Sequence, residues 1–436
     1  MKLKKNLRRV GIGLSVLGLI VGSGIWMNMQ QMEHTTYVNH AMKDSDEYEM
    51  LSFEEYLGED INLLKGEEIN KIKGVYEKIA ENEEKEKFDE ADKLWDEFDD
   101  LLREAGIAVV YKDFMDFAET IKSELSEKDF DKLNTIYEHI EKMNEQLEEV
   151  DDEDEKQIEK MEAKVEKSYE QMKEILSPLG YDVDEIMAHI EAKSILIALY
   201  DVHDEKIQYK PVNKQTMDEL SKEDIKKHKD LWEKAKKIIP TSYLERITSF
   251  EINTDGKEEV LAHVESPDES NKIWRLAIDI KDAFDQDGKF NKELDKTIIH
   301  EFGHILTLND GQMMKERNEN SITYTTDEGS TTKDSYLNQF YNEFWKSIHK
   351  EWEKASESVN DDSEENQALI DFYEEHKNEF VSEYASTNPE EDIAESFTNF
   401  IVEDKPKGNT IAQRKILFFY QFEELIKIRE EIKIVT

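Results

Sequence analysis

The sequence contains no cysteine, and this absence removes several kinds of chemistry at once. Disulfide bonds, thiolate metal ligands, cysteine nucleophiles and the lipid-modified cysteine of a lipoprotein are all excluded. A metal site in this chain therefore has to be built from histidine and carboxylate side chains. Proline is also scarce, and only Pro178 falls between residues 45 and 190. We therefore expect long, uninterrupted helices in that stretch.

Basic residues are also scarce relative to acidic ones. The 436 residues include 57 Lys plus Arg against 103 Asp plus Glu, which gives a formal net charge of −46 and a pI near 4.6. This balance excludes a nucleic-acid partner, because binding to phosphates requires clustered Lys and Arg. Charged residues make up 37% and apolar residues 38%, so we expect solvated helical surface beside a modest core. The length still allows about three domains of roughly 150 residues.

The first thirty residues have the pattern of a membrane-targeting segment. Five positive charges and no acidic residue precede residue 10, and no charged residue occurs from Val10 to Met32. The apolar run Val10–Met27 is long for a signal-peptide core of ~7–15 residues and just long enough to span a bilayer. We favour a retained single-pass signal anchor over residues 1–30, with a cleaved signal as the alternative. In both cases the positive-inside rule places the rest of the chain outside the cytoplasm.

Residues 31–190 are predicted to form an acidic helical region. Apolar residues recur at three- and four-residue spacing in two stretches, which begin near residues 52 and 126 with capping-box patterns. Gly106 and Gly180 follow the later helices, so we expect two antiparallel helical hairpins closed by glycine C-caps. Residues 148–155 contain seven acidic residues in eight. They could bind cations or a basic partner, but we favour a solvated turn between two helices.

The periodicity changes after residue 190, where the pattern becomes that of a small sheet. Residues 195–200 are an apolar run, and alternating or apolar patterns further on predict three strands, at residues 247–252, 260–264 and 274–280. Asn253–Gly256 is a turn signal and predicts a hairpin between the first and second of these strands. The expected fold is therefore α+β and mainly α. A helical N-terminal region is followed, over residues 191–436, by a domain with a small sheet.

The most informative motif is His300-Glu301-Phe302-Gly303-His304. In a helix, two histidines at i and i+4 lie on one face about one turn apart, so both imidazoles can bind one Zn²⁺ at ~2.0–2.1 Å. Glu301 lies beside them, where a carboxylate can accept a proton from a metal-bound water. The alternative is a core helix with two surface histidines. The preceding sheet and the export signal favour the zinc site.

A catalytic zinc site needs a third protein ligand, and Asp310 is the first candidate. It follows His304 by six residues, which is close to the spacing of metzincins. However, Thr307 stands where that arrangement needs a glycine for a sharp turn of the chain.

Glu391 is the second candidate for the third ligand. It lies in the first turn of a helix that Asn388 is expected to cap and Pro389 to begin. Glu395 is one turn further along the same face and would hold a ligand histidine by its other ring nitrogen. On spacing alone, Glu391 is equally well explained as a residue of the helix cap, although it is a better candidate for the ligand than Asp310.

Three stretches of the chain resemble the gluzincin metallopeptidases related to the anthrax toxin lethal factor: residues 300–304, 382–388 and 391–397. In that family a tyrosine stands seven residues before the ligand glutamate, and Tyr384 and Glu391 have this separation. The resemblance implies His300, His304 and Glu391 as zinc ligands, Glu301 as general base, and the Tyr384 hydroxyl as the group that stabilises the tetrahedral oxyanion.

The resemblance covers about residues 245–436 and implies a zincin-like catalytic domain there. One feature departs from it: the 87-residue separation of His304 and Glu391 exceeds what a compact member would use. The additional segment is expected to serve as a lid or a specificity element.

These observations predict a membrane-anchored, extracytoplasmic zinc endopeptidase that acts on a peptide or protein substrate. The strand at residues 274–280 is expected to pair with extended substrate as an edge strand. The alternative is a non-catalytic anchored helical interaction protein with a vestigial or structural zinc site. The presence of Glu301 favours the enzyme, because a structural site has no need of it. A closed four-ligand zinc site that includes Asp310 is a third possibility.

Overall fold

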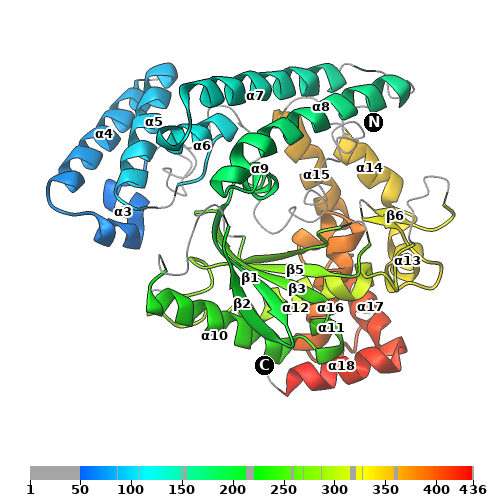
Figure 1. Cartoon of the computed structure of the whole chain (residues 1–436). Coiled ribbons are helices and arrows are strands. Elements are labelled where there is room, and N and C mark those ends of the chain that lie inside the picture. The colour runs from blue at the N-terminus through cyan, green and yellow to red at the C-terminus, as the bar shows by residue number, and fades with distance from the viewer. Residues whose placement is uncertain are drawn as a thin grey trace.

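The computed structural model describes residues 50–434, apart from gaps at 86, 108, 149, 151–154, 213–219, 257–259, 269, 286, 315–320, 327 and 358–361. The fold is α+β and mainly α, with a helical N-terminal region followed by a part that contains a five-stranded sheet (Figure 1). This confirms the fold class predicted from the sequence. The predicted anchor over residues 1–30 lies outside the described residues. Within the described ranges, no helix is long and apolar enough to cross a bilayer.

Two long helical hairpins and several short helices make up the N-terminal region. The first hairpin pairs α4 with α5, and the second pairs α7 with α8, as predicted. The bounds are α3 Phe53–Leu57, α4 Glu67–Glu84, α5 Phe88–Glu104, α6 Phe114–Thr120, α7 Glu127–Glu148, α8 Glu155–Leu176 and α9 Val183–Glu191. Each hairpin has a hydrophobic core of its own, one around Trp95 and Phe98 and the other around Phe114 and Met172.

The predicted glycine caps are present at the ends of both later helices. Gly106 and Gly180 have φ values of 83° and 89°, a left-handed conformation that favours glycine. After α5, the amide of Ile107 donates to the carbonyl of Leu102 at 2.9 Å, and an equivalent bond of 3.2 Å closes the end of α8. These bonds satisfy helix-end carbonyls and turn the chain out of each helix.

The sheet has the strand order β2-β1-β3-β5-β4. Its strands are β1 Ile195–His203, β2 Lys206–Lys210, β3 Ile247–Thr254, β4 Ala262–Glu265 and β5 Trp274–Asp279. β3 and β5 are parallel, and the other neighbouring pairs are antiparallel. β1 covers the apolar run at residues 195–200, which the sequence analysis did not assign as a strand, and β2 was not predicted. β2 returns from β1 through a turn at Asp204 and Glu205, which have φ values of 49° and 60° although neither is glycine.

The predicted hairpin between residues 247–252 and 260–264 is wrong. β5 lies between β3 and β4, so the edge strand on this side is β4 and not the strand at residues 274–280. A long-range hydrogen bond holds the end of β3 beside β5, because the Asp279 carboxylate at the end of β5 accepts the Asp255 amide at 2.8 Å. The turn at Gly256 (φ 86°) does form, but the chain then crosses the end of β5 and reaches its far side.

The two faces of the sheet have different chemistry because alternate side chains of a strand point to opposite faces. Phe250, Leu276 and Ile278 belong to the main hydrophobic core with α10 and α12. On the opposite face, Glu251 and Arg275 form ion pairs beneath α9. Figure 1 shows the sheet between these two layers of helices.

The remaining helices enclose the core from the side of α12. Their bounds are α10 Lys222–Ile238, α11 Thr241–Leu244, α12 Leu294–Leu308, α13 Tyr336–Phe340, α14 His349–Glu357, α15 Asp362–His376, α16 Pro389–Val402, α17 Ile411–Phe418 and α18 Glu423–Lys433. A short hairpin, β6 Thr325–Thr326 with β7 Gly329–Ser330, and a π-helical turn, Tyr341–Trp345, lie between α12 and α14.

Candidate metal centre

α12 presents the two histidines of the His-Glu-x-x-His motif. Its apolar side is buried in the main core, as the helical spacing predicted, through Leu294, Ile298, Phe302 and Ile305. The helix is therefore anchored from one side. His300 and His304 lie on the other side, and both are almost fully buried, with 8% and 2% of their surface exposed.

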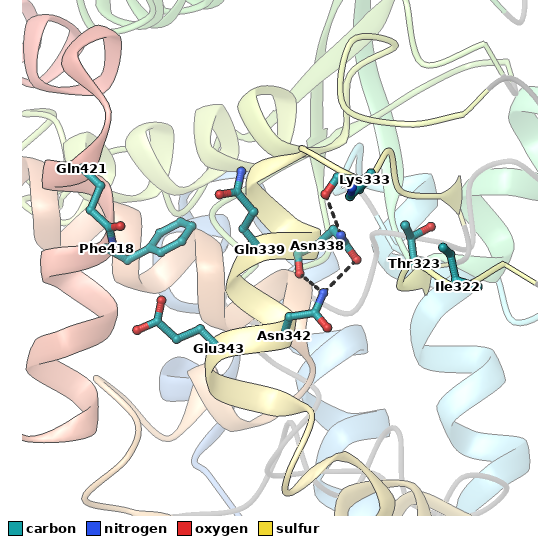
Figure 2. A pocket seen from close by; sticks show the side chains of 9 residues that line it. All are labelled: Ile322, Thr323, Lys333, Asn338, Gln339, Asn342, Glu343, Phe418 and Gln421. Carbon is teal, nitrogen blue, oxygen red and sulfur yellow. Dashed lines mark hydrogen bonds between the residues drawn. The ribbon is translucent and has the colours of Figure 1, made fainter.

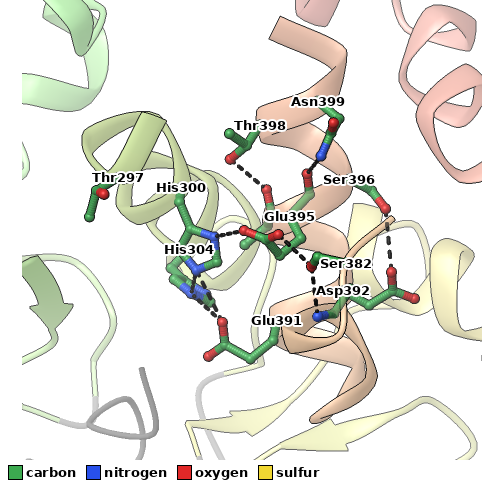
Figure 3. A network of polar contacts seen from close by, with 12 residues as sticks. Thr297, His300, His304, Ser382, Glu391, Asp392, Glu395, Ser396, Thr398 and Asn399 are labelled. Carbon is green, nitrogen blue, oxygen red and sulfur yellow. Dashed lines mark hydrogen bonds and ion pairs between the residues drawn. The ribbon is translucent and has the colours of Figure 1, made fainter. Parts of the chain in front are cut away.

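α16 provides the carboxylates that face these histidines. The side chain of Asn388 accepts the Glu391 amide at 2.8 Å, and Pro389 occupies the first turn, so the predicted helix start is confirmed. Glu391 and Glu395 are one turn apart and both point towards α12, as Figure 3 shows.

Gly303 permits the close approach of α12 and α16. A Cβ atom at this position would lie 3.2 Å from the Cα of Ala394 and 3.4 Å from the side chain of Phe397. Both distances are at or below ordinary van der Waals contact, so a larger side chain would hold the helices apart. The sequence analysis did not assign Gly303 this packing role.

Three ligand-type atoms converge between the two helices. Nε2 of His300 lies 3.0 Å from Oε2 of Glu391 and 3.1 Å from Nε2 of His304. Nε2 of His304 lies 3.4 Å from the same carboxylate oxygen. Ligands of one four-coordinate zinc lie about 3.3–3.4 Å from each other. The two nitrogens and the oxygen therefore have the spacing of a single metal site.

The second nitrogen of His300 is held by a carboxylate. Nδ1 of His300 lies 2.9 Å from Oε1 of Glu395, and the Ser382 hydroxyl donates to the other oxygen of Glu395 at 2.6 Å. Since a carboxylate only accepts, Nδ1 of His300 carries a proton in this contact, and Nε2, which faces Glu391 and His304, is the nitrogen that a metal would bind in place of a proton. This contact has the orienting geometry expected for Glu395. Nδ1 of His304 is buried and has no hydrogen-bond partner among the described residues.

The electrostatics of the group also fit a cation. Burial opposes protonation of His300, but the bonds to Glu391 and Glu395 outweigh it and raise the pKa of His300 well above its usual value. Burial likewise opposes ionisation of Glu391, yet His304 and His300 hold the pKa of this carboxyl well below its usual range. The site therefore favours positive charge beside an ionised carboxylate, and a divalent metal ion supplies that charge.

Glu301 and Tyr384 lie beside these three residues. Burial raises the pKa of Glu301 to about 7, while His300 and His304 oppose the rise. α12, which carries Glu301, packs against the edge strand β4. The Tyr384 ring centre lies 5.7 Å from that of His300.

Asp310 is not part of the group. α12 continues through Thr307, whose hydroxyl donates to the carbonyl of Gly303, so the chain does not make the turn that a metzincin-like arrangement requires. The Asp310 carboxylate instead forms an ion pair of 2.6 Å with Arg246. The three residues that the structure brings together as possible ligands are His300, His304 and Glu391.

Two other groups of side chains are close enough to hold a cation by distance alone: Glu185 with His189 and Glu251, and Asp255 with Asp279 and Asp282. In the first group, Arg275 donates to both oxygens of Glu185 at 2.9 and 2.7 Å and to Glu251 at 3.0 Å, so a positive charge is already in place. In the second, the Asp279 carboxylate accepts three backbone amides at 2.6–3.1 Å. Both groups are therefore structural.

A surface pocket of about 560 Å³ lies between the segment around α13 and the C-terminal helices (Figure 2). Its amide side chains are used within the protein. Asn338 donates to the carbonyl of Lys333 at 2.8 Å and accepts the Tyr324 amide and the side chain of Asn342. None of the residues that line it belongs to the metal group, and we assign it no ligand.

Ser382 supports the site through Glu395, a role that the sequence analysis did not assign to it. Ser382 lies in an irregular segment, and its bond to Glu395 depends on how residues 305–388 fold back onto α16. The helix patterns and the histidine spacing are local, whereas these contacts join distant parts of the chain. No family model, curated protein or solved structure matches this chain.

Proposed function

We propose that this protein is a zinc-dependent endopeptidase. His300, His304 and Glu391 would hold the metal, and residues 1–30 would anchor the chain with its catalytic part outside the cytoplasm. The observation that carries the proposal is the convergence of two imidazole nitrogens and one carboxylate oxygen within 3.0–3.4 Å. A bound zinc supplies Lewis-acid polarisation of the scissile carbonyl and of the attacking water.

The chain's own residues have separable roles in this proposal. Glu301 takes the proton of the attacking water, a task that suits a carboxyl whose pKa burial raises to about 7. Tyr384 donates from its hydroxyl to the developing oxyanion. Glu395 keeps the proton on Nδ1 of His300 and so directs Nε2 towards the metal.

The substrate would bind as an extended peptide along β4. This is the edge strand of the sheet, and α12, which carries Glu301, packs against it. A peptide that pairs with β4 would therefore pass beside the proposed base, and main-chain hydrogen bonds would hold it with little dependence on its sequence.

The alternative, an anchored interaction protein with a structural zinc site, leaves Glu301 unexplained. Only 7% of the surface of Glu301 is exposed, and burying a carboxylate is costly unless it has a function or a partner. The Glu301→Gln variant separates the two proposals. It retains the size and hydrogen-bonding ability of the side chain but cannot accept the proton.

We expect full-length Glu301→Gln to keep one zinc per chain and to lose peptide hydrolysis by about 10²–10⁴-fold, the usual contribution of a general base. The measurements are zinc content and cleavage of a peptide library. Glu293→Gln makes the same chemical change just before α12, at an exposed position, and should keep full activity. Undiminished hydrolysis by Glu301→Gln would show that Glu301 is not the base. Absence of zinc-dependent cleavage by the wild type would support the interaction protein.

A further inference from the structure

The long segment between the two ligand helices folds back over the start of α16. Three aromatic side chains of this segment donate hydrogen bonds to it. The hydroxyl of Tyr324 reaches the carboxylate of Glu390 at 3.0 Å. The indole N–H groups of Trp345 and Trp352 reach the Asp392 carboxylate at 2.7 Å and the Thr387 carbonyl at 2.8 Å. We refer to Tyr324, Trp345 and Trp352 as the aromatic clamp.

The three acceptors of the clamp bracket the proposed metal ligand in the sequence. Glu390 and Asp392 are the immediate neighbours of Glu391, and Thr387 precedes the helix cap. The amide of Glu391 is itself held by the Asn388 side chain at 2.8 Å. The side chains of both neighbours of Glu391 and the Thr387 carbonyl are therefore held from outside α16, while the side chain of Glu391 faces the histidines.

The strongest of these contacts ends on a buried carboxylate. Asp392 has no exposed surface and also lies 2.6 Å from Nζ of Lys415, which comes from α17 and is equally buried. The same ammonium lies 3.8 Å above the centre of the Phe380 ring. A buried charge with these two oriented partners cannot turn away without losing them, so Asp392 resists rotation of the first turn of α16.

Ring contacts hold the members of the aromatic clamp in place. The rings of Tyr324 and Tyr341 are stacked with centres 4.3 Å apart, and the ring of His349 meets both edge-on at 5.8 and 5.1 Å. Trp345 meets Trp352 edge-on at 6.0 Å. Such ring pairs favour one mutual arrangement. The three donors thus present a preorganised surface to α16.

We propose that Tyr324, Trp345 and Trp352 are positioning residues that set the affinity of the metal site by holding Glu391 against His300 and His304. This inference rests on the proposed metal site and adds to it a task for the long segment between the ligands. The histidines are anchored through the core side of α12, whereas the third ligand depends on the clamp. Loss of a clamp bond is expected to weaken metal binding through Glu391 alone.

The test is zinc affinity, measured by competition with a chromophoric chelator on the full-length protein. Trp345→Phe keeps an aromatic ring and removes the N–H group, and Tyr324→Phe removes only the hydroxyl. Each is expected to weaken zinc binding by about 10–100-fold, the range seen when a partner of a metal ligand is lost. The absorption spectrum of the cobalt-loaded variants should shift as well, because it reports the geometry of the ligands.

The matched control is Trp232→Phe. The indole of Trp232 is buried and donates to the carbonyl of Glu205 at 2.9 Å, so the substitution removes the same kind of bond in α10, away from α16. It should leave zinc affinity and the cobalt spectrum unchanged. If Trp345→Phe is too unstable to purify, Tyr324→Phe is sufficient for the test, because it removes only the hydroxyl group and should fold normally.

A double-mutant cycle separates positioning from a general structural effect. In a Glu391→Ala background the clamp has no ligand to position, so Trp345→Phe should change zinc affinity less than about twofold, far below the range for a lost partner. If Trp345→Phe weakens zinc binding by about 10–100-fold in that background as well, the positioning role is contradicted. Wild-type zinc affinity of both Trp345→Phe and Tyr324→Phe would contradict it too. If Glu391→Ala itself binds zinc as the wild type does, the proposed ligand set fails, and this result is recognisable independently of the clamp variants.

Discussion

At the scale of single residues, the chemistry of the centre depends on which nitrogen carries a proton. Glu395 accepts from Nδ1 of His300 and is itself held by Ser382. This leaves Nε2 of His300 as the atom that faces Glu391 and His304. Two residues that are distant in the sequence thus hold the imidazole of His300 in the orientation that a metal ligand requires.

The third ligand can be tested at the same scale. Glu391→Ala removes a carboxylate that meets both histidines, so we expect zinc affinity to fall by at least about 10–100-fold. Asp310→Ala should leave zinc affinity unchanged, because this carboxylate pairs with Arg246 at a partly exposed position. Its effect on the free energy of unfolding should stay within about 1 kcal/mol, as for most surface ion pairs.

Zinc stoichiometry and chelator competition measure both variants. Zinc lost from Asp310→Ala and retained by Glu391→Ala would contradict the assignment and favour a metzincin-like ligand set.

At the scale of elements, the centre depends on how closely α12 and α16 approach. Gly303 lies where the two helices meet. Gly74 lies in α4, and no atom stands within 4 Å of the position that an added methyl group would take there. The two glycines offer a matched comparison, because the same substitution meets a crowded neighbour in one helix and open space in the other.

We expect Gly303→Ala to destabilise the protein and Gly74→Ala to stabilise it. Alanine is favoured over glycine in a helix by about 1 kcal/mol, and Gly74→Ala should gain close to that. At Gly303 the added methyl lies 3.2 Å from the Cα of Ala394, and overpacking of this kind costs about 1–3 kcal/mol.

Separation of the helices should also weaken zinc binding by Gly303→Ala and leave it intact in Gly74→Ala. Chemical denaturation and chelator competition measure the two effects. Equal stabilisation by both substitutions would mean that α12 and α16 can move apart freely.

The order of the strands shows how a local pattern can mislead at this scale. The turn signal at Asn253–Gly256 is real, since Gly256 has a φ of 86°. The expected hairpin still does not form, because Asp279 at the end of β5 binds the amide that follows β3. A bond between residues 24 positions apart outweighs the local preference, and the edge strand on this side of the sheet is β4 rather than β5.

At the scale of the whole molecule, the helical region meets the sheet through charged rather than apolar groups. Arg275 of β5 lies between Glu185 of α9, Glu251 of β3 and Glu265 of β4, at 2.7–3.2 Å from each. Two histidines, His189 and His263, interact electrostatically with the same cluster. Three carboxylates against one guanidinium leave an excess of negative charge in a buried place.

This excess predicts a stability that depends on pH. Burial, together with Glu251 and Glu185, raises the pKa of Glu265 to about 7 although Arg275 opposes the rise. The folded state therefore binds this proton more tightly than the unfolded chain, where the ordinary value is 4.5. The stabilisation is complete below pH 4.5 and is lost as the pH rises through about 7.

Glu265→Gln should remove this dependence. Relative to the wild type, we expect the variant to gain up to about 3 kcal/mol in the free energy of unfolding as the pH rises across that window. The measurement is urea denaturation of both proteins at several pH values. Glu293→Gln, which removes an exposed carboxylate outside the cluster, is the control. A constant difference between Glu265→Gln and the wild type would contradict the raised pKa.

The sequence alone determined the features that depend on neighbours along the chain. Helical periodicity, capping residues such as Asn388 and the glycines after α5 and α8 are local, and the structure confirms them. The spacing of His300 and His304 also determines that both lie on one face of a helix. The absence of cysteine restricted any metal site to histidine and carboxylate.

Only the tertiary structure decided the rest, because those contacts join residues that are far apart in the chain. It brought Glu391 across 87 positions to His304, placed Asp310 on Arg246, and moved the edge strand to β4. It also assembled the aromatic clamp around α16. Several arrangements of the strands and helices satisfy the local patterns equally well. Burial and pairing between distant residues decide among them, and these contacts leave no periodic pattern in the sequence.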